Sequence, residues 1–175
     1  MPSSRTITIY KFDELSDKAK EKARDWYREG ALEYDWWDGV YEDAKNIGLK
    51  IASFDTDRGN SIEGDFKDDA ESCAKAILKE HGKDCDSYKL ADEYLETHKA
   101  LRTQFDEACE ADDDPVLIRK LDEGLVELDA EFKRAILEDY LDTLKKEVEY
   151  RMSDESVDES ILANEYDFLG SGKRA

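Results

Sequence analysis

The chain has 175 residues, with 46 acidic against 26 basic side chains, and its formal net charge at neutral pH is −20. This charge excludes most nucleic-acid-binding proteins, because they need a basic surface that displaces counterions from phosphates. Apolar residues make up 39% of the chain and aromatic residues 10%, whereas acidic disordered tails have few aromatics. We therefore expect a folded protein.

The sequence predicts a protein of the cytoplasm that does not contact membranes. Its apolar stretches are far shorter than the ~20 residues that span a bilayer, and no apolar segment follows the N-terminal residues. The three cysteines, Cys73, Cys85 and Cys109, are odd in number and widely spaced, which favours free thiols over a disulfide framework. The negative charge repels DNA and anionic lipids and attracts basic protein patches, so the expected partner is a basic macromolecule.

The N-terminal third predicts one strand and two helices. Residues 5–11 alternate in polarity and are rich in β-branched side chains, which predicts a strand with one buried face. Ser16 is a suitable N-cap for a helix whose apolar spacing continues to Gly30. A second helix is expected from about Asp35 to Ile47, followed by Gly48 at its C-terminus.

The middle of the chain predicts a β-hairpin and a third helix. Residues 49–54 and 61–66 alternate in polarity and are separated by a cluster of turn-forming residues. Asp68 or Asp69 can cap the following helix, which Gly82 ends.

Two long amphipathic patterns follow, on either side of the short acidic segment 111–115. Their apolar residues recur at intervals of three and four, as in the seam between paired helices. Pro115 suits the first position of the second helix after an Asp114 cap. A short connection between two long helices predicts an antiparallel helical hairpin over 86–152 that projects from the small sheet.

The last part predicts a short helix over 153–162, a strand over 165–168 and a frayed tail. The expected fold class is α+β, in which a small antiparallel β-sheet packs with helices and a long antiparallel αα-hairpin is added. No linker divides the chain, so we expect a single domain over 1–175. Its expected parts are an α/β core (1–83 and 153–168), an acidic helical hairpin (86–152) and a flexible tail (169–175).

The negative charge is concentrated in the predicted hairpin. Residues 84–159 contain 25 acidic and 10 basic side chains, a net charge of −15. Carboxylates four residues apart on a helix are separated by ~6 Å along its axis, close to two steps of ~3.4 Å along a nucleic-acid strand. The hairpin can therefore imitate a row of phosphates. The alternative is an ordinary solvated helix face, because several acids have a basic neighbour one turn away, as Glu138 has Arg134.

Two adjacent tryptophans, Trp36 and Trp37, form a second candidate contact. Neighbouring residues on a helix point ~100° apart, so both cannot face inward. One of them is expected as an exposed anchor for a partner, and partial burial under the hairpin is the alternative. The predicted partner-binding residues are Asp106, Glu107, Glu110, Asp112, Asp113, Asp114, Asp122, Glu123, Glu127, Asp129, Trp36 and Trp37.

No motif predicts catalysis, a cofactor or a metal site. Residues 55–59 begin like a calcium loop, but their glycine comes one residue early. Cys73, His81 and Cys85 lack the close pair of ligands that zinc sites use. The standard nucleophile, phosphate-loop and zinc-protease motifs are missing from the sequence, so we expect a protein that is not an enzyme. A metal-dependent hydrolase with clustered carboxylates stays a third alternative.

Several segments resemble a family of small acidic proteins encoded by bacteriophages and prophages. The resemblance lies in residues 6–16, 19–27, 36–43 and 153–168, and residues 53–59 resemble one branch of the family. The family has no established activity and is sometimes labelled antitoxin-like. The resemblance implies a setting in the cytoplasm of a bacterial host, during infection or prophage carriage.

Small acidic phage proteins include inhibitors of host defence that mimic nucleic acid, among them anti-CRISPR and anti-restriction proteins. By analogy of class and charge, we expect a binding protein whose hairpin occupies a basic groove on a host nucleic-acid-binding defence complex. The expected partner is a basic host protein or nucleoprotein complex, with no direct binding of nucleic acid or membrane. Pairing of two chains through the hairpin seam stays open. The alternative is an antitoxin-like or regulatory module that binds a protein through its aromatic N-terminal surface.

Overall fold

The structure is a computed structural model that describes residues 6–175. It confirms the α+β class, since helices dominate and four strands form two separate two-stranded antiparallel sheets among these residues. The chain divides into two compact units: the described residues up to Trp36 together with Lys145–Ala175, and residues Trp37–Leu144. We refer to them as unit 1 and unit 2. The two units differ from the expected core and helical hairpin, because the two long helices share a hydrophobic core with residues of the β-hairpin at 49–66.

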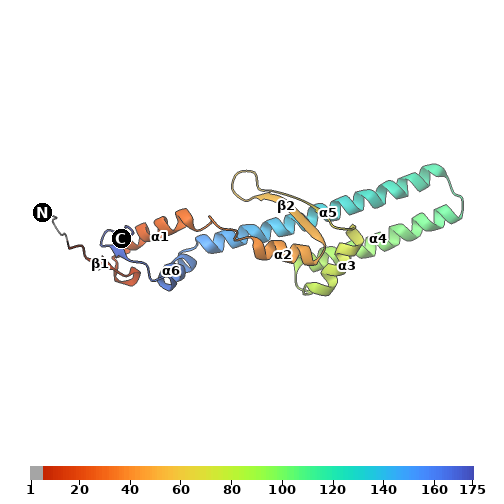
Figure 1. Cartoon of the computed structure of the whole chain (residues 1–175). Coiled ribbons are helices and arrows are strands. Elements are labelled where there is room, and N and C mark those ends of the chain that lie inside the picture. The colour runs from red at the N-terminus through yellow and green to blue at the C-terminus, as the bar shows by residue number, and fades with distance from the viewer. Residues whose placement is uncertain (1–5) are drawn as a thin grey trace. The chain divides into compact units, whose positions relative to one another are not determined.

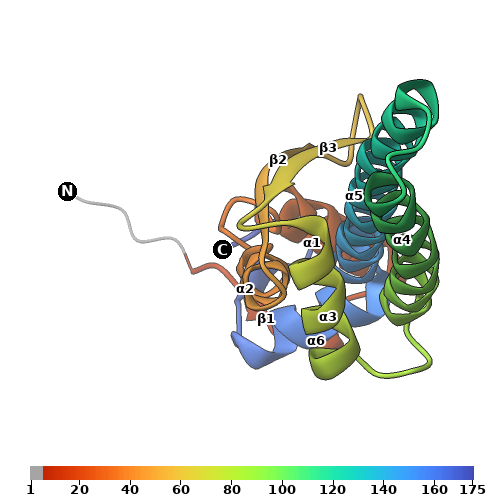
Figure 2. The same cartoon turned by 90° about the vertical axis from the view of Figure 1, so that its right-hand side faces the viewer.

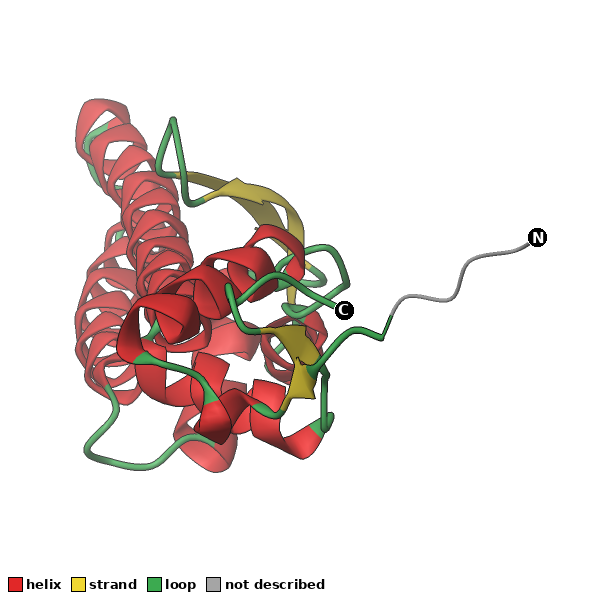
Figure 3. Cartoon of the chain, turned by 90° about the vertical axis from the view of Figure 1, so that its left-hand side faces the viewer, coloured by secondary structure: helices red, strands yellow, loops and turns green. Residues whose placement is uncertain are grey.

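Unit 1 contains β1 (Ile9–Tyr10), the 3₁₀ turn η1 (Phe12–Glu14), α1 (Asp17–Gly30), the last part of α5 (Pro115–Met152), α6 (Asp154–Ala163) and β4 (Phe168–Leu169). Ser16 and Ser153 cap α1 and α6 with their side chains, as the sequence predicts. β1 pairs antiparallel with β4, close to the C-terminus in Figure 3. The predicted first strand is thus shorter than expected, and its Arg5 lies outside the described residues. The last strand begins three residues later than predicted.

The segment 169–175, predicted to be a flexible tail, is instead folded against unit 1. The Leu169 N–H donates to the Lys173 carbonyl (2.8 Å), and the Ala175 N–H donates to the Asp167 carbonyl (3.0 Å). Gly172 makes this return possible, because its φ is +85° and an added Cβ would lie 2.1 Å from the Ala19 carbonyl oxygen. The glycines that suggested fraying therefore permit a tight contact.

Unit 2 contains α2 (Asp38–Asn46), β2 (Leu49–Asp55), β3 (Ser61–Phe66), α3 (Ala70–Glu80), α4 (Asp86–Glu110) and α5 as far as Leu144. The β2–β3 hairpin has the predicted position, with Leu49 opposite Phe66 and an irregularity between Ile51 and Ser53. Gly48 ends α2 with a φ of +75°. α2 begins later than predicted, after Trp37 at its N-cap.

The two long helices form the predicted antiparallel hairpin. α4 and α5 run side by side, with their connecting turn at the far end of unit 2 (Figures 1 and 2). Pro115 is the first residue of α5, and the Asp114 carboxylate accepts a hydrogen bond from the Val116 N–H (2.9 Å).

The core of unit 2 lies between α5, α3, α4 and the β2–β3 hairpin. Phe132 of α5 stacks on Tyr94 of α4 (4.3 Å between ring centroids) and on Phe66 of β3 (5.9 Å). Ile136 lies one turn further along α5 and is fully buried. Through Phe132, α5 therefore packs on both α4 and the β2–β3 hairpin.

The three cysteines are free, and we expect them to differ sharply in reactivity. Cys73 is buried in the core of unit 2, and burial raises the pKa of its thiol to about 12, whereas Cys85 and Cys109 are exposed. At pH 8 a thiol reagent should label two sites quickly and Cys73 only after denaturant is added. Mass spectrometry of timed samples checks this, with Cys73→Ala as the control. Equally fast labelling of all three would contradict the packing of α3.

Asp69 caps α3 and should make stability depend on pH. Its carboxylate accepts a hydrogen bond from the Ser72 N–H (2.7 Å), and this bond holds the pKa of Asp69 below its ordinary value of 3.8. The Asp69→Ala variant should lose about 1 kcal/mol of unfolding free energy at pH 7.

The lowered pKa sets the sign of the pH dependence for this cap. The charged cap stabilises the folded state above pH 3.8, and its contribution is lost as the pH falls through the lower folded pKa. The difference between the parent protein and Asp69→Ala should therefore shrink in acid, as measured by urea unfolding at pH 7 and pH 3. A difference that grows in acid would contradict this role.

Candidate functional site

The end of the α4–α5 hairpin presents a dense set of carboxylates. Residues 103–132 contain eleven acidic and two basic side chains, a net charge of −9. We call the nine exposed members of this set that the sequence predicted to bind a partner the acidic tip. It consists of Asp106, Glu107, Glu110, Asp112, Asp113, Asp114, Asp122, Glu123 and Glu127. They come from the last turns of α4, the connecting turn and the first turns of α5, so the structure brings nine of the predicted residues to one end of the hairpin (Figure 1).

Ion pairs among the described residues neutralise only a small part of this charge. Asp106 pairs with Arg102 (3.2 Å), and Glu123 pairs with Arg119 (3.6 Å), in each case one turn away on the same helix. The other seven carboxylates of the acidic tip form no ion pair within residues 6–175. Asp113 and Asp114 accept hydrogen bonds from backbone N–H groups instead. One-turn ion pairs therefore involve only two of the nine carboxylates, and the alternative of an ordinary solvated face, which needs no ion pairs, stays open.

Asp129, also predicted to bind a partner, has an internal role. Its carboxylate is half-buried and accepts a hydrogen bond from the Tyr94 hydroxyl across the hairpin (2.6 Å). Burial, and then this bond, raise the pKa of Tyr94. Asp129 therefore joins the two helices behind the acidic tip rather than extending it.

Neither tryptophan of the pair is fully exposed, and the alternative of partial burial fits them better. Trp36 is buried, and Trp37 is half-buried with its ring edge-on to Phe54 (5.6 Å). The prediction placed both residues inside one helix, where neighbours diverge around the axis. α2 begins only at Asp38, so that helical geometry does not apply to them.

Three apolar side chains accompany the acidic tip. Val116, Leu117 and Val126 of α5 are 48%, 42% and 64% exposed. Leu117 was expected in the buried seam, but it lies in the first turn of α5, at the end of the hairpin. The candidate surface is thus mixed, with aliphatic groups set among carboxylates.

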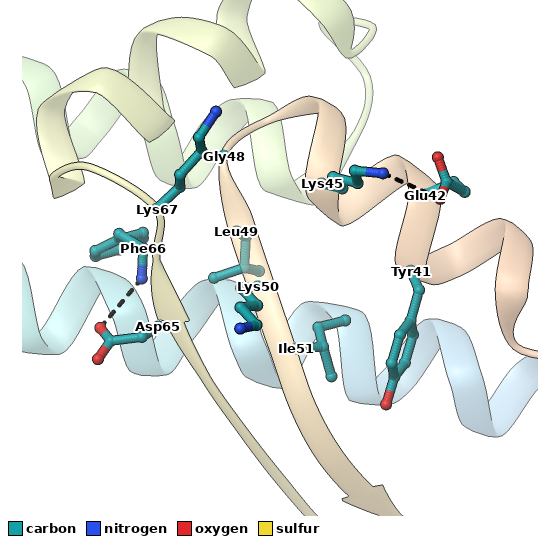
Figure 4. A pocket seen from close by; sticks show the side chains of 10 residues that line it. All are labelled: Tyr41, Glu42, Lys45, Gly48, Leu49, Lys50, Ile51, Asp65, Phe66 and Lys67. Carbon is teal, nitrogen blue, oxygen red and sulfur yellow. Dashed lines mark hydrogen bonds and ion pairs between the residues drawn. The ribbon is translucent and has the colours of Figure 1, made fainter.

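One cavity of unit 2 lies between α2 and the β2–β3 hairpin (Figure 4). It has a volume of about 560 Å³ and is lined by apolar side chains, three lysines and two carboxylates. Lys45 pairs with Glu42 (3.5 Å), and Asp65 pairs with Lys133 of α5, which lowers the pKa of that carboxyl. The three lysines and two carboxylates nearly balance, so the cavity has no marked preference for ligand charge.

A chain of polar side chains in unit 2, buried at Ser87 and exposed at Asp43, was not found from the sequence. The Ser87 hydroxyl lies 2.7 Å from His81 Nδ1, His81 Nε2 lies 3.4 Å from an Asp43 oxygen, and the Tyr140 hydroxyl donates to that oxygen (2.7 Å). Ser87 is only 4% exposed, so a substrate could not reach its hydroxyl. This chain therefore ties α2, α3, α4 and α5 together instead of forming a nucleophilic site. Within residues 6–175, no group of three or more histidine, cysteine or acidic side chains is arranged to hold a metal ion.

Comparisons with known protein families, curated proteins and solved structures give no match. None of the helices in the described residues combines the length and the apolar character needed to cross a membrane.

Proposed function

We propose that this protein is a non-enzymatic inhibitor whose acidic tip binds a basic groove that otherwise accepts nucleic acid. The expected partner is a nucleic-acid-binding defence complex of a bacterial host, reached in the cytoplasm, as the resemblance to phage proteins suggests. The observation that carries the proposal is the set of seven exposed carboxylates at the end of the hairpin without an ion pair among the described residues.

Physical reasons support a binding role for this surface. Crowding like charges at a turn costs stability unless a partner compensates them. A concentrated negative surface also steers a basic partner toward it and makes the association rate sensitive to salt. The Tyr94–Asp129 bond and the stacking of Tyr94 on Phe132 hold the two helices together behind the tip. The carboxylates are therefore held on a defined scaffold before binding.

The alternative, a module that binds through its aromatic N-terminal surface, has less support from the two residues predicted for it. Trp36 is buried and Trp37 is half-buried, so neither offers the freely exposed ring that the alternative expected.

The test is affinity capture from a bacterial lysate followed by competition with nucleic acid. The parent protein should capture a basic protein or complex, and added DNA or RNA should displace it. A variant with a neutralised acidic tip should fail to capture the same partner. Capture that nucleic acid does not displace, or that survives neutralisation of the tip, would overturn the proposal.

A further inference from the structure

Unit 1 has a cavity of its own, separate from the acidic tip. It has a volume of about 490 Å³ and lies at the C-terminal end of α1. Its lining includes Trp26 and Tyr27 of α1, Tyr34 from the segment after α1, and Tyr166 from the segment before β4. Four aromatic rings thus surround one open cavity.

The rings are arranged as walls rather than as a closed stack. Tyr166 meets Trp26 edge to face, with 5.2 Å between centroids and 88° between planes. Tyr27 meets the same tryptophan at 6.3 Å and 66°. The face of an aromatic ring carries the negative part of its quadrupole. Such a site attracts cations.

Charges at the cavity favour the same kind of ligand. Glu29 and Glu33 belong to its lining, both are exposed, and neither forms an ion pair within residues 6–175. α1 ends at Gly30, which also lines the cavity, so the negative end of the helix dipole lies there. The rings, the carboxylates and the helix end therefore all favour a positive group.

Three of these rings already contact guanidinium groups of the chain itself. Arg174 lies over Tyr166 (4.8 Å) and over Trp26 (5.9 Å), and Arg151 lies over Tyr34 (5.6 Å). Neither arginine belongs to the lining of the cavity, so these internal contacts leave its space open. They show which cation these rings accommodate.

We propose that this cavity binds an arginine side chain presented by a basic peptide segment of a partner. A planar guanidinium stacks on aromatic faces and can donate hydrogen bonds to carboxylates at the same time, which a lysine ammonium does less well. The site uses none of the acidic tip residues, so it stands independently of the proposed inhibition.

The test is a titration of the whole protein with a short peptide that contains one arginine. Binding is monitored through the tryptophan indole N–H signals in NMR spectra. Exposed cation–π contacts and exposed ion pairs are individually weak, so binding should be weak, with a Kd on the order of millimolar. The Trp26 signal should shift, and the peptide with citrulline in place of arginine should leave it unchanged. A Trp26→Phe variant assigns the signal.

Matched variants distinguish binding in the cavity from attraction of the peptide by the overall negative charge of the protein. Glu29→Gln with Glu33→Gln should weaken binding roughly 3- to 10-fold, as expected for two exposed ion pairs. The control, Glu155→Gln with Glu159→Gln, removes the same charge from exposed positions on α6 and should have little effect.

Tyr34, which is 54% exposed, allows a second comparison. Tyr34→Ala should weaken binding, whereas Tyr34→Phe keeps the ring and should preserve binding although it loses the hydrogen bond from Arg151. Tyr150→Ala removes an equally exposed ring (55%) outside the cavity and serves as control.

Equal shifts with the citrulline peptide, or equal weakening by the control variants, would overturn the proposal. Equal binding of a lysine peptide or of tetramethylammonium would overturn the assignment to arginine. Neutralising the acidic tip should leave this titration unchanged, so the two proposals can fail separately.

Discussion

Replacing Asp112, Asp113, Asp122 and Glu123 together by their amides should weaken binding of the basic partner roughly 100-fold. Each exposed ion pair contributes about 0.2–1 kcal/mol, so four of them at about 0.7 kcal/mol give this factor. All four side chains are exposed, and only Glu123 has an ion pair among the described residues, so the substitutions should not unfold the protein. Calorimetry or surface plasmon resonance at several salt concentrations measures the change, and the salt dependence should become shallower.

A variant with the same net charge provides the control. Asp84, Asp92, Glu93 and Glu96 are exposed, lie in or just before the first half of α4, and form no ion pair within residues 6–175. Changing these four to their amides should lower affinity only slightly, because they lie outside the acidic tip. If both quadruple variants weaken binding equally, general charge attracts the partner and the tip has no special role.

Ile136→Ala should lower the free energy of unfolding of unit 2 by about 2–5 kcal/mol. Removing a buried aliphatic side chain costs its transfer free energy and leaves a cavity that neighbours fill only in part. Ile136 is fully buried on α5 and belongs to the same core as Leu49, Ile77 and Tyr94. The cavity would therefore open where four elements meet. Urea unfolding followed by circular dichroism measures the loss.

Val126→Ala is the matched control on the same helix. Val126 is 64% exposed, so its truncation should change stability by less than about 0.5 kcal/mol. A large loss in Val126→Ala, or none in Ile136→Ala, would mean that α5 presents a different face to the core.

Local signals in the sequence predicted most elements correctly. Ser16, Asp69 and Ser153 cap helices through contacts within three residues, and Pro115 begins α5 for an equally local reason. The exposed carboxylates of the acidic tip could be predicted in the same way, because they fall outside the apolar stripe of each helix. The helix caps, the start of α5 and the exposed positions of the acidic tip are all determined by residues close together in the sequence.

Features that depend on distant residues could not be predicted. The close approach at Gly172 is to Ala19, and the Asp129 carboxylate accepts its hydrogen bond from Tyr94. Both partners are far away in the sequence. The aromatic cavity in unit 1 likewise needs Tyr166 beside Trp26, which no spacing along the chain reveals. These contacts exist only after the chain has folded.

The three exposed aliphatic side chains on α5 have a consequence for the thermodynamics of association. A purely ionic contact would fade at high ionic strength, but covering Val116, Leu117 and Val126 removes apolar area from water, which salt does not screen. Complex formation through this surface should therefore show a negative change in heat capacity, and a residual, entropy-driven attachment should persist in concentrated salt.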